Sequence, residues 1–266
     1  MLSSLSTAFL LSLLRFWFAA AFQKYDSEFA RFAFEHAAAA YSKDPLRCVG
    51  KYFGTSILRQ GSVSCDHFHD ECLYYISKSP TYIVVAFGGT HSKLQLTAEI
   101  LAGMAEPKMN NTRPILFTGH SLGGALASLA SSHFAYFTPR SDIRLVTFGQ
   151  PRTGNRGYAL AHDILVPKSF RIVHRGDLVP HLPVCLIDVR TFSCAPQFGF
   201  APYHHGLEVW YPQNMTETSP YELCLDEPKD EDRTCSDGYY RYNIHDHLFY
   251  FGEHVSNYGI AGCKKN

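Results

Sequence analysis

The sequence predicts an α/β fold in which a mostly parallel sheet is flanked by helices within a single domain. Short apolar runs rich in β-branched residues alternate along the chain with Ala- and Leu-rich stretches of helical character. Hydrophobic residues make up 46% of the sequence and charged residues 18%, which is a globular rather than a disordered composition. A chain of 266 residues is also long enough to bury a substantial single core.

The individual elements follow one another in the order that such a sheet requires. Residues 25–42, where Ala, Phe and Glu dominate, are expected to form a helix that ends before Asp44-Pro45. Continuous apolar runs predict buried strands over residues 81–87, 115–118, 143–148 and 170–174, with a shorter strand over 209–211. Further helices are predicted over residues 125–134 and 243–251.

The charge balance excludes one class of partner. The chain carries 24 basic and 24 acidic residues, so its formal net charge is zero. Proteins that bind nucleic acid need an excess of Lys and Arg to meet the phosphates. We therefore expect no nucleic-acid partner.

The N-terminus predicts export. An apolar run over residues 8–14 is followed by Arg15, three aromatic residues and three alanines. This pattern predicts a signal peptide over residues 1–21 and a secreted domain over residues 22–266. The segment lacks a basic start and contains Arg15, so an amphipathic first helix or an imperfect membrane anchor is the alternative. No uninterrupted run of 18 or more apolar residues occurs elsewhere, and no transmembrane helix is expected.

The cysteines agree with an oxidising compartment, because an even number in an exported chain is typical of disulfides. The eight cysteines suggest the pairs Cys65–Cys72, Cys185–Cys194 and Cys224–Cys235, which leaves Cys48–Cys263 to join the two ends of the mature domain. Reduced thiols in a cytosolic protein are the alternative. A zinc site is a weaker alternative because the chain has no C-x-x-C. Sequons at Asn110 and Asn214 are compatible with glycosylation.

The segment Gly119-His120-Ser121-Leu122-Gly123 matches the nucleophile elbow of the α/β-hydrolase fold. In this motif the serine lies on a sharp turn between a strand and a helix. The two glycines are required because a Cβ at either position would clash with neighbouring backbone. The free N–H groups at the start of the helix favour the negative charge of a tetrahedral intermediate. A β-rich run before the motif and an Ala- and Leu-rich stretch after it supply the expected context.

A serine nucleophile needs a base and a carboxylate, which follow it in the order Ser, Asp, His in this fold. Asp177 comes just after the strand predicted over residues 170–174, so it lies on the same rim of the sheet as the elbow. The candidate histidines are His204, His205, His245 and His247. Spacing does not choose among these four.

Four segments resemble the class 3 (fungal-type) lipase family. They are FTGHSLGGALA at residues 117–127, FGQPRTGN at 148–155, RIVHRGDLVP at 171–180 and DHLFYF at 246–251. The resemblance extends over residues 25–263. Residues 203–205 and 208–211 make the chain most similar to the nematode members of the family.

The resemblance implies a role for each matching residue. Ser121 would be the nucleophile, His247 the general base and acid, and Asp177 the residue that orients His247. The backbone N–H of Leu122 and residue Thr90 would form the oxyanion hole. The implied function is that of a secreted lipase, which hydrolyses ester bonds of acylglycerol lipids and contacts a lipid interface transiently. No cofactor and no metal are expected, and the protein is expected to be a monomer.

Two departures from the family pattern lie before the elbow. Gly88 stands where the family usually has arginine, and the segment from Thr90 to Ser121 is shorter than usual and lacks the V-H-x-G-F stretch. We expect the loss of a core strand to remove ladder hydrogen bonds from its neighbours and to impair catalysis, unless residues 94–104 fill the space. A short-chain or phenolic esterase and a catalytically impaired lipid-binding relative are therefore the alternatives.

Overall fold

The computed structural model describes residues 24–64, 71–89, 113–138, 140–216, 218–226 and 230–264. Several predictions fall outside these residues. They are the signal peptide, Cys65, Thr90, Asn110 and the shortened segment before residue 113.

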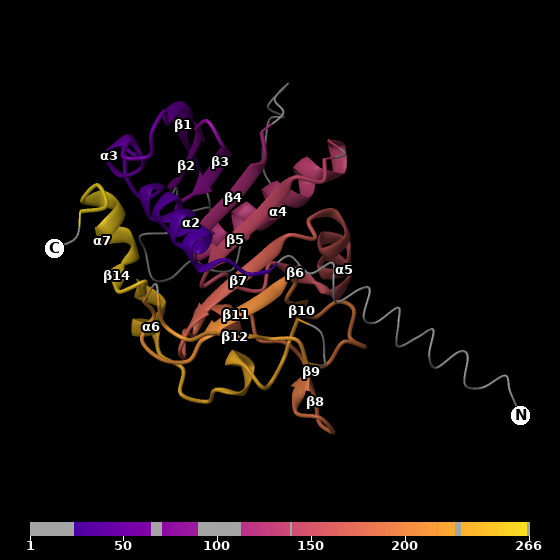
Figure 1. Ribbon diagram of the computed structural model, residues 1–266. Coiled ribbons are helices and arrows are strands. Elements are labelled where there is room, and N and C mark those ends of the chain that lie inside the picture. The colour runs from indigo at the N-terminus through magenta and orange to yellow at the C-terminus, as the bar shows by residue number, and fades with distance from the viewer. Residues whose placement is uncertain are drawn as a thin grey trace, which may run out of the picture.

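The core of the molecule is an eight-stranded sheet, with the strand order β1-β2-β3-β4-β5-β7-β11-β12 (Figure 1). The strands are β1 (Ser56–Ser64), β2 (Glu71–Lys78), β3 (Ile83–Phe87), β4 (Ile115–His120), β5 (Ile143–Phe148), β7 (Ser169–His174), β11 (Leu207–Tyr211) and β12 (Glu222–Leu223). The five strands from β3 to β11 are parallel, whereas β1, β2 and β12 are antiparallel at the two edges. The predicted α/β fold with a mostly parallel sheet is confirmed.

Helices cover both faces of this sheet. The helices are α2 (Ser27–Ala39), α3 (Leu46–Val49), α4 (Leu122–Phe137), α5 (Arg156–Leu165), α6 (Ile244–Leu248) and α7 (Val255–Ile260). Alternate residues of β4 point to opposite faces, so Leu116 packs in the same cluster as Phe34 of α2, while Phe117 packs with Ala127 of α4. Burial on both faces explains why the central strands read as uninterrupted apolar runs.

The ladder between β3 and β4 bears on the expected loss of a strand. β3 pairs with β2 on one side and directly with β4 on the other, in a register that runs from Ile83 opposite Ile115 to Phe87 opposite Gly119. The described sheet is therefore continuous across this point. The expected loss of ladder hydrogen bonds does not occur between these three strands.

The predicted C-terminal helix over residues 243–251 is wrong beyond Leu248. Helix α6 ends there, and the chain forms a small hairpin of β13 (Phe249–Tyr250) and β14 (Glu253–His254) before α7. Phe251 and Gly252, with φ of 51° and 76°, make the turn of this hairpin. Left-handed backbone at two successive positions ends a helix.

Three of the four expected disulfides lie within the described residues. All three pair as predicted, and they are Cys48–Cys263, Cys185–Cys194 and Cys224–Cys235. Cys72 is disulfide-bonded, and its expected partner Cys65 is outside the described residues. Cys48–Cys263 joins α3 to the segment after α7, which lie side by side although the two cysteines are 215 positions apart in sequence.

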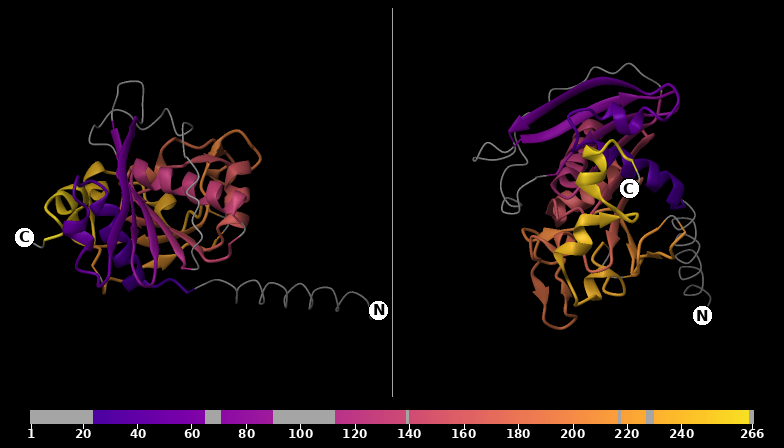
Figure 2. Two further views of the ribbon diagram at one scale, coloured as in Figure 1. Left: turned by 90° about the horizontal axis from the view of Figure 1, so that it is seen from above. Right: turned by 90° about the vertical axis from the view of Figure 1, so that its left-hand side faces the viewer.

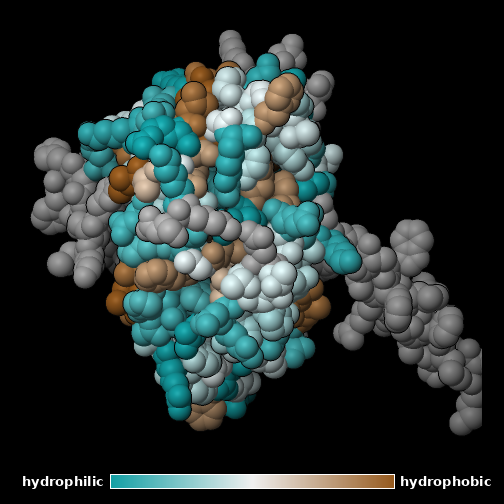
Figure 3. Space-filling model, turned by 60° about the vertical axis from the view of Figure 1, so that its left-hand side comes forward, coloured by the Kyte–Doolittle hydropathy of each residue, from teal (hydrophilic) through white to brown (hydrophobic). Residues whose placement is uncertain are grey.

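Three further results concern the membrane, the surface and the second sequon. In the described part of the chain, no helix is both long and apolar enough to span a membrane. The face drawn in Figure 3 is mostly hydrophilic, with hydrophobic residues in separate patches. Asn214 of the second sequon is exposed, as a glycosylation site requires.

Candidate active site

Ser121 occupies the sharp turn between β4 and α4. Its backbone has φ 60° and ψ −131°, a conformation that is strained for a residue with a side chain. Its N–H donates to the Phe148 carbonyl oxygen at 2.9 Å, which fixes the turn against β5. A Cβ on Gly119 would lie 2.2 Å from the Gly123 oxygen, and one on Gly123 would lie 2.3 Å from the Phe87 oxygen. Both glycines are therefore needed for the turn.

The backbone next to Ser121 can receive a negative charge. The N–H of Leu122, the first residue of α4, donates to no acceptor within the described residues, whereas the N–H groups of Gly124 and Ala125 donate back to the Ser121 carbonyl oxygen. A helix N-terminus also carries a partial positive charge. These two properties suit the Leu122 N–H to an oxyanion hole.

Gly88 fits tightly against the end of α2. A Cβ at this position would lie 2.7 Å from the Ala40 carbonyl oxygen. The arginine that the family usually has here would not fit without movement of the backbone. Glycine in place of the family's arginine thus allows the backbone at Gly88 to lie close to the backbone at the end of α2.

Asp177 and His247 come together from distant parts of the chain. Asp177 follows β7, and its backbone forms an isolated parallel bridge with Asn243. Asn243 caps α6 by accepting the Asp246 N–H at 2.8 Å, so α6 begins beside the Asp177 loop. This arrangement places His247 Nδ1 2.9 Å from each carboxylate oxygen of Asp177.

The surroundings of Asp177 favour its charged form. The residue is fully buried, which by itself would raise its pKa. His247, the Tyr250 hydroxyl and the Val179 N–H act in the opposite direction, and the net result is a pKa below the ordinary value. The Tyr250 hydroxyl donates at 2.6 Å and the Val179 N–H at 2.9 Å. Asp177 can therefore remain a carboxylate beside the imidazole.

Gly149 explains why the segment FGQPRTGN is part of the site. Its φ is +56°, and a Cβ there would lie 2.6 Å from Asp177 Oδ2 and 2.8 Å from His247 Nδ1. Any side chain would force the two residues apart. This loop after β5 thus leaves the space in which the pair forms.

His120 connects the elbow to α6. Its Nε2 lies 2.8 Å from the His247 carbonyl oxygen, which can only accept, so Nε2 carries the proton. The Tyr41 hydroxyl then donates to His120 Nδ1 at 2.7 Å. Burial lowers the pKa of His120 to about 3, so the ring stays neutral. The two imidazoles stack with centroids 4.5 Å apart, which holds His247 next to the residue that precedes Ser121.

The other candidate histidines are engaged elsewhere. His204 Nε2 lies 2.8 Å from the Pro180 carbonyl oxygen, and His205 Nε2 lies 2.7 Å from Ser128 Oγ. His245 stacks on Phe249 with ring centroids 4.7 Å apart. The geometry therefore favours His247 among the four histidines. Tyr250 and Tyr41 were given no role by the sequence, although Tyr250 lies within the segment DHLFYF.

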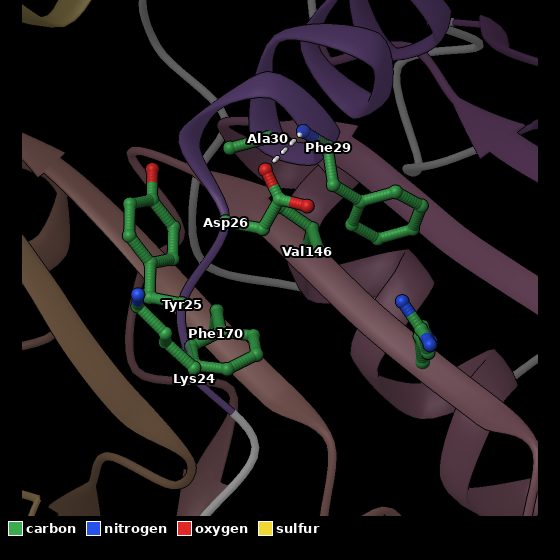
Figure 4. Close-up of a pocket in the computed structure, with 8 residues that line it drawn as sticks. Lys24, Tyr25, Asp26, Phe29, Ala30, Val146 and Phe170 are labelled. Atoms are coloured by element: carbon green, nitrogen blue, oxygen red, sulfur yellow. Dashed lines mark hydrogen bonds between the residues drawn. The ribbon is translucent and has the colours of Figure 1, made fainter.

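Two other features lie away from this site. His162, Asp163 and His205 are close enough to hold a metal ion, but His205 already contacts Ser128 and Gln150 in a buried polar cluster. A small pocket at the start of α2 is lined by eight residues, among them Asp26, which accepts the Phe29 N–H (Figure 4). That pocket adjoins the amino ends of β5 and β7, whereas Ser121 and Asp177 lie at the carboxyl ends.

Comparison with known proteins identifies the family. The family model for lipase (class 3) matches residues 107–187. The lipase ZK262.3 of Caenorhabditis elegans is 34% identical over 293 aligned residues, which cover 90% of this chain and 83% of that protein. The chain belongs to the class 3 lipase family. This family consists of serine hydrolases, and the similarity to a nematode member agrees with the sequence-based assignment.

Fungal members of the class 3 lipase family share part of the sequence and the whole fold. A lipase of Rhizopus niveus is 35% identical over 145 residues, which cover 53% of this chain and 32% of that protein. The structure of lipase II from the same organism superposes with a TM-score of 0.64 at 22% identity, covering 87% of this chain and 98% of that one. The single-domain α/β-hydrolase fold is confirmed.

Proposed function

We propose that the chain is a secreted carboxylic ester hydrolase that acts on acylglycerol lipids through Ser121, His247 and Asp177. The observation that carries this proposal is the buried contact between His247 and Asp177, with Nδ1 2.9 Å from both carboxylate oxygens. A strained serine at a helix N-terminus follows directly after His120, on which the His247 ring stacks. Membership of the class 3 lipase family supports the lipid ester as substrate.

The proposed reaction has two halves. His247 Nε2 takes the Ser121 hydroxyl proton as Oγ attacks the ester carbonyl carbon, and the Leu122 N–H stabilises the resulting oxyanion. The carbon–oxygen bond to the alcohol then breaks, and the leaving alkoxide receives the proton from His247. Water attacks the acyl-enzyme in the same way, which releases the fatty acid and returns the proton to Ser121. Asp177 stabilises the imidazolium in both halves.

Relatives support parts of this proposal. A solved triacylglycerol lipase, whose catalytic centre is formed by a serine protease triad, has the same fold (TM-score 0.61, 20% identity). Thr90 is proposed as the second oxyanion donor because it follows Gly89 in sequence, and a Cβ on Gly89 would lie 2.8 Å from the His120 carbonyl oxygen of the elbow. Residues 1–21 are proposed as a signal peptide before a domain of residues 22–266, and the disulfides support secretion.

The test is hydrolysis of p-nitrophenyl esters from acetate to palmitate by the secreted protein. We expect Ser121→Ala to lower kcat by about five orders of magnitude or more, because no other group can form the acyl-enzyme. Ser132→Ala, on the same helix, is the matched control and should retain turnover.

The chain-length profile separates the candidate activities. Turnover of long-chain esters supports a lipase, and turnover confined to acetate and butyrate would indicate a short-chain esterase instead. A folded wild type that hydrolyses none of these esters would refute the proposal. The shortened segment between Thr90 and Ser121 would then be the first place to look for the cause.

A further inference from the structure

Exposed apolar side chains are concentrated in one segment of the chain. Of the 19 large hydrophobic residues that are exposed in the described structure, seven lie within residues 184–200. The five most exposed of these are Val184, Ile187, Val189, Phe192 and Phe200, and we call them the hairpin patch. Val189 and Phe200 are each 78% exposed. Such a concentration is typical of an interaction surface, because single exposed apolar residues are usually scattered.

The hairpin patch is held in a fixed shape. Strands β8 (Ile187–Asp188) and β9 (Ser193–Cys194) form an antiparallel pair, and the Cys185–Cys194 disulfide closes the loop at its base. At the tip, the Phe192 N–H donates to the Asp188 carbonyl oxygen at 2.7 Å, and Phe192 has a left-handed φ of 54°. Three side chains of the patch, Ile187, Val189 and Phe192, are therefore displayed by a closed loop. Val184 and Phe200 lie outside this loop, one before it and one after it in sequence.

The base of this hairpin is attached to the rim that carries the candidate site. Arg152, in the loop after β5, donates through its backbone N–H to the Leu182 carbonyl oxygen and through Nη1 to the His181 carbonyl oxygen, both at 2.8 Å. Its Nη2 contacts Cys194 Sγ at 3.3 Å. The same loop contains Gly149, which abuts Asp177 and His247. The hairpin patch thus has a fixed position relative to the site.

The hairpin projects outward from the body of the molecule, as Figure 1 and the right-hand view of Figure 2 both show. The hairpin itself carries one acidic and one basic side chain, Asp188 in β8 and Arg190 at the tip, and the Arg233 guanidinium donates to the Thr191 carbonyl oxygen at 3.0 Å. A surface with projecting apolar groups and no cluster of Lys and Arg is suited to an uncharged lipid phase, whereas an anionic membrane attracts such clusters.

We propose that the hairpin patch docks the protein on a neutral lipid surface and thereby presents lipid esters to Ser121. This inference rests on the proposed function, because it names the surface from which that site draws its substrate. Insertion of apolar side chains into the acyl region transfers them from water, and the disulfide lowers the conformational cost of presenting them.

The experiment compares two double variants by flotation with phosphatidylcholine-coated trioleoylglycerol droplets. Val189→Asp with Phe192→Asp changes the hairpin patch. Tyr136→Asp with Phe137→Asp adds the same charge to exposed residues at the far end of α4, 70% and 56% exposed, and is the matched control. Both are made in the Ser121→Ala background as well, so that binding is measured without hydrolysis.

We expect the hairpin variant to bind droplets about tenfold more weakly or worse, while the control binds like the wild type. Hydrolysis of soluble p-nitrophenyl acetate should stay within about twofold in both variants, which also shows that they fold. Salt should not weaken wild-type binding, since charge does not drive it.

Three results would overturn the inference. They are unchanged droplet binding by a folded hairpin variant, a requirement for anionic lipid, and a dimer in sedimentation velocity that the hairpin substitutions abolish without affecting droplet binding. The last result would assign the surface to a second copy of the chain. If no ester is hydrolysed but the Ser121→Ala protein binds droplets through the hairpin, the proposed function fails and the docking surface stands.

Discussion

Two histidine–aspartate pairs among the described residues are shielded from solvent, and they differ in what surrounds the carboxylate. In the first pair His247 Nδ1 lies 2.9 Å from Asp177, and in the second His181 Nδ1 lies 2.9 Å from Asp237 Oδ1. Both carboxyl groups have a pKa below the ordinary value. The pair alone therefore does not distinguish the candidate site from another part of the interior.

The neighbours of the two carboxylates make the difference. Besides His247, Asp177 accepts hydrogen bonds from neutral donors, the Tyr250 hydroxyl and the Val179 N–H. Asp237 lies 3.4 Å from Nη2 of Arg152, which also makes a bidentate ion pair with Glu231 at 2.7 and 2.9 Å. Since an arginine stays charged, Asp237 has a permanent cation beside it, which it shares with Glu231. The negative charge of Asp177 is left to stabilise a proton on its histidine.

The two imidazole rings also differ in what they contact besides their aspartates. His247 stacks on His120, the residue before the strained Ser121. His181 Nε2 is buried without a hydrogen-bond partner among the described residues, and its ring packs on Tyr242 with centroids 4.1 Å apart. The first imidazole stacks on the residue before the proposed nucleophile, whereas the second packs against Tyr242. The groups in contact with the imidazole and the carboxylate therefore decide which of the two pairs can take part in catalysis.

Exchange of each aspartate for asparagine is expected to give the largest difference in kcat between the two pairs. Asp177→Asn should lower kcat for a p-nitrophenyl ester by about four orders of magnitude, because the amide holds the imidazole in the wrong tautomer. Asp237→Asn should leave kcat within about threefold, since His181 touches no proposed reacting group. Equal losses in the two variants, with both folded, would contradict the distinction.

Loss of the buried arginine is expected to act on stability rather than on chemistry. Arg152→Met should lower the free energy of unfolding by about 3–5 kcal/mol, because it leaves Glu231 buried without its cation. Urea denaturation measures this loss. Lys51→Met is the control, since Lys51 pairs with Glu35 at 2.8 Å but its side chain is 49% exposed, so that it should cost no more than about 1 kcal/mol.

Exchange of the two tyrosines beside the pairs, Tyr250 and Tyr242, for phenylalanine is expected to give the smallest difference in kcat. Tyr250→Phe removes a donor to the Asp177 carboxylate and should lower kcat by about tenfold, the effect of about 1.5 kcal/mol. Tyr242→Phe removes a hydroxyl that donates only weakly to the backbone carbonyl oxygens of Ser236 and Asp237, at 3.4 and 3.3 Å, and should leave kcat unchanged. A loss of activity confined to Tyr242→Phe would reverse the assignment.

Tyr250→Phe also has an expected pH signature. A carboxyl group with a lowered folded-state pKa contributes stability that is present above its unfolded pKa and is lost as the pH falls through the folded value. For Asp177 that loss lies below pH 3.8, its ordinary pKa. Without the Tyr250 hydroxyl the folded-state pKa rises, so thermal unfolding should show less stabilisation by Asp177 and an earlier loss on acidification. If the wild type and Tyr250→Phe lose thermal stability identically as the pH falls, the Tyr250 hydroxyl does not stabilise the Asp177 carboxylate.

Some parts of the fold could be predicted from the sequence and others could not. The buried parallel strands were predicted to within about two residues at each end, because burial on both faces leaves continuous apolar runs. Strand β1 was not predicted, since its mixed polar residues lack such a run, and the apolar run over residues 72–76 of β2 was not assigned to a strand. The C-terminal helix was overextended because Asn243 and Asp246 begin a helix, whereas Phe249 and Tyr250 pair with β14.

The candidate site shows the same division. The elbow spacing places Ser121, and the position after a strand places Asp177. The choice of His247 among four histidines came only from the family resemblance, and its contact with Asp177 depends on the bridge between Asp177 and Asn243. Tyr250 and Tyr41 act through hydroxyl groups that cross 73 and 79 residues of sequence, and no local pattern indicates contacts of that range.

The Cys48–Cys263 disulfide has a consequence for how the chain responds to proteases. It closes a covalent ring that contains nearly the whole described chain, because its two cysteines are 215 positions apart in sequence. A single cut anywhere inside the ring leaves two fragments joined through sulfur. The cut protein would migrate as one species on a denaturing gel until a reducing agent separates the pieces, so a nick alone cannot release either fragment.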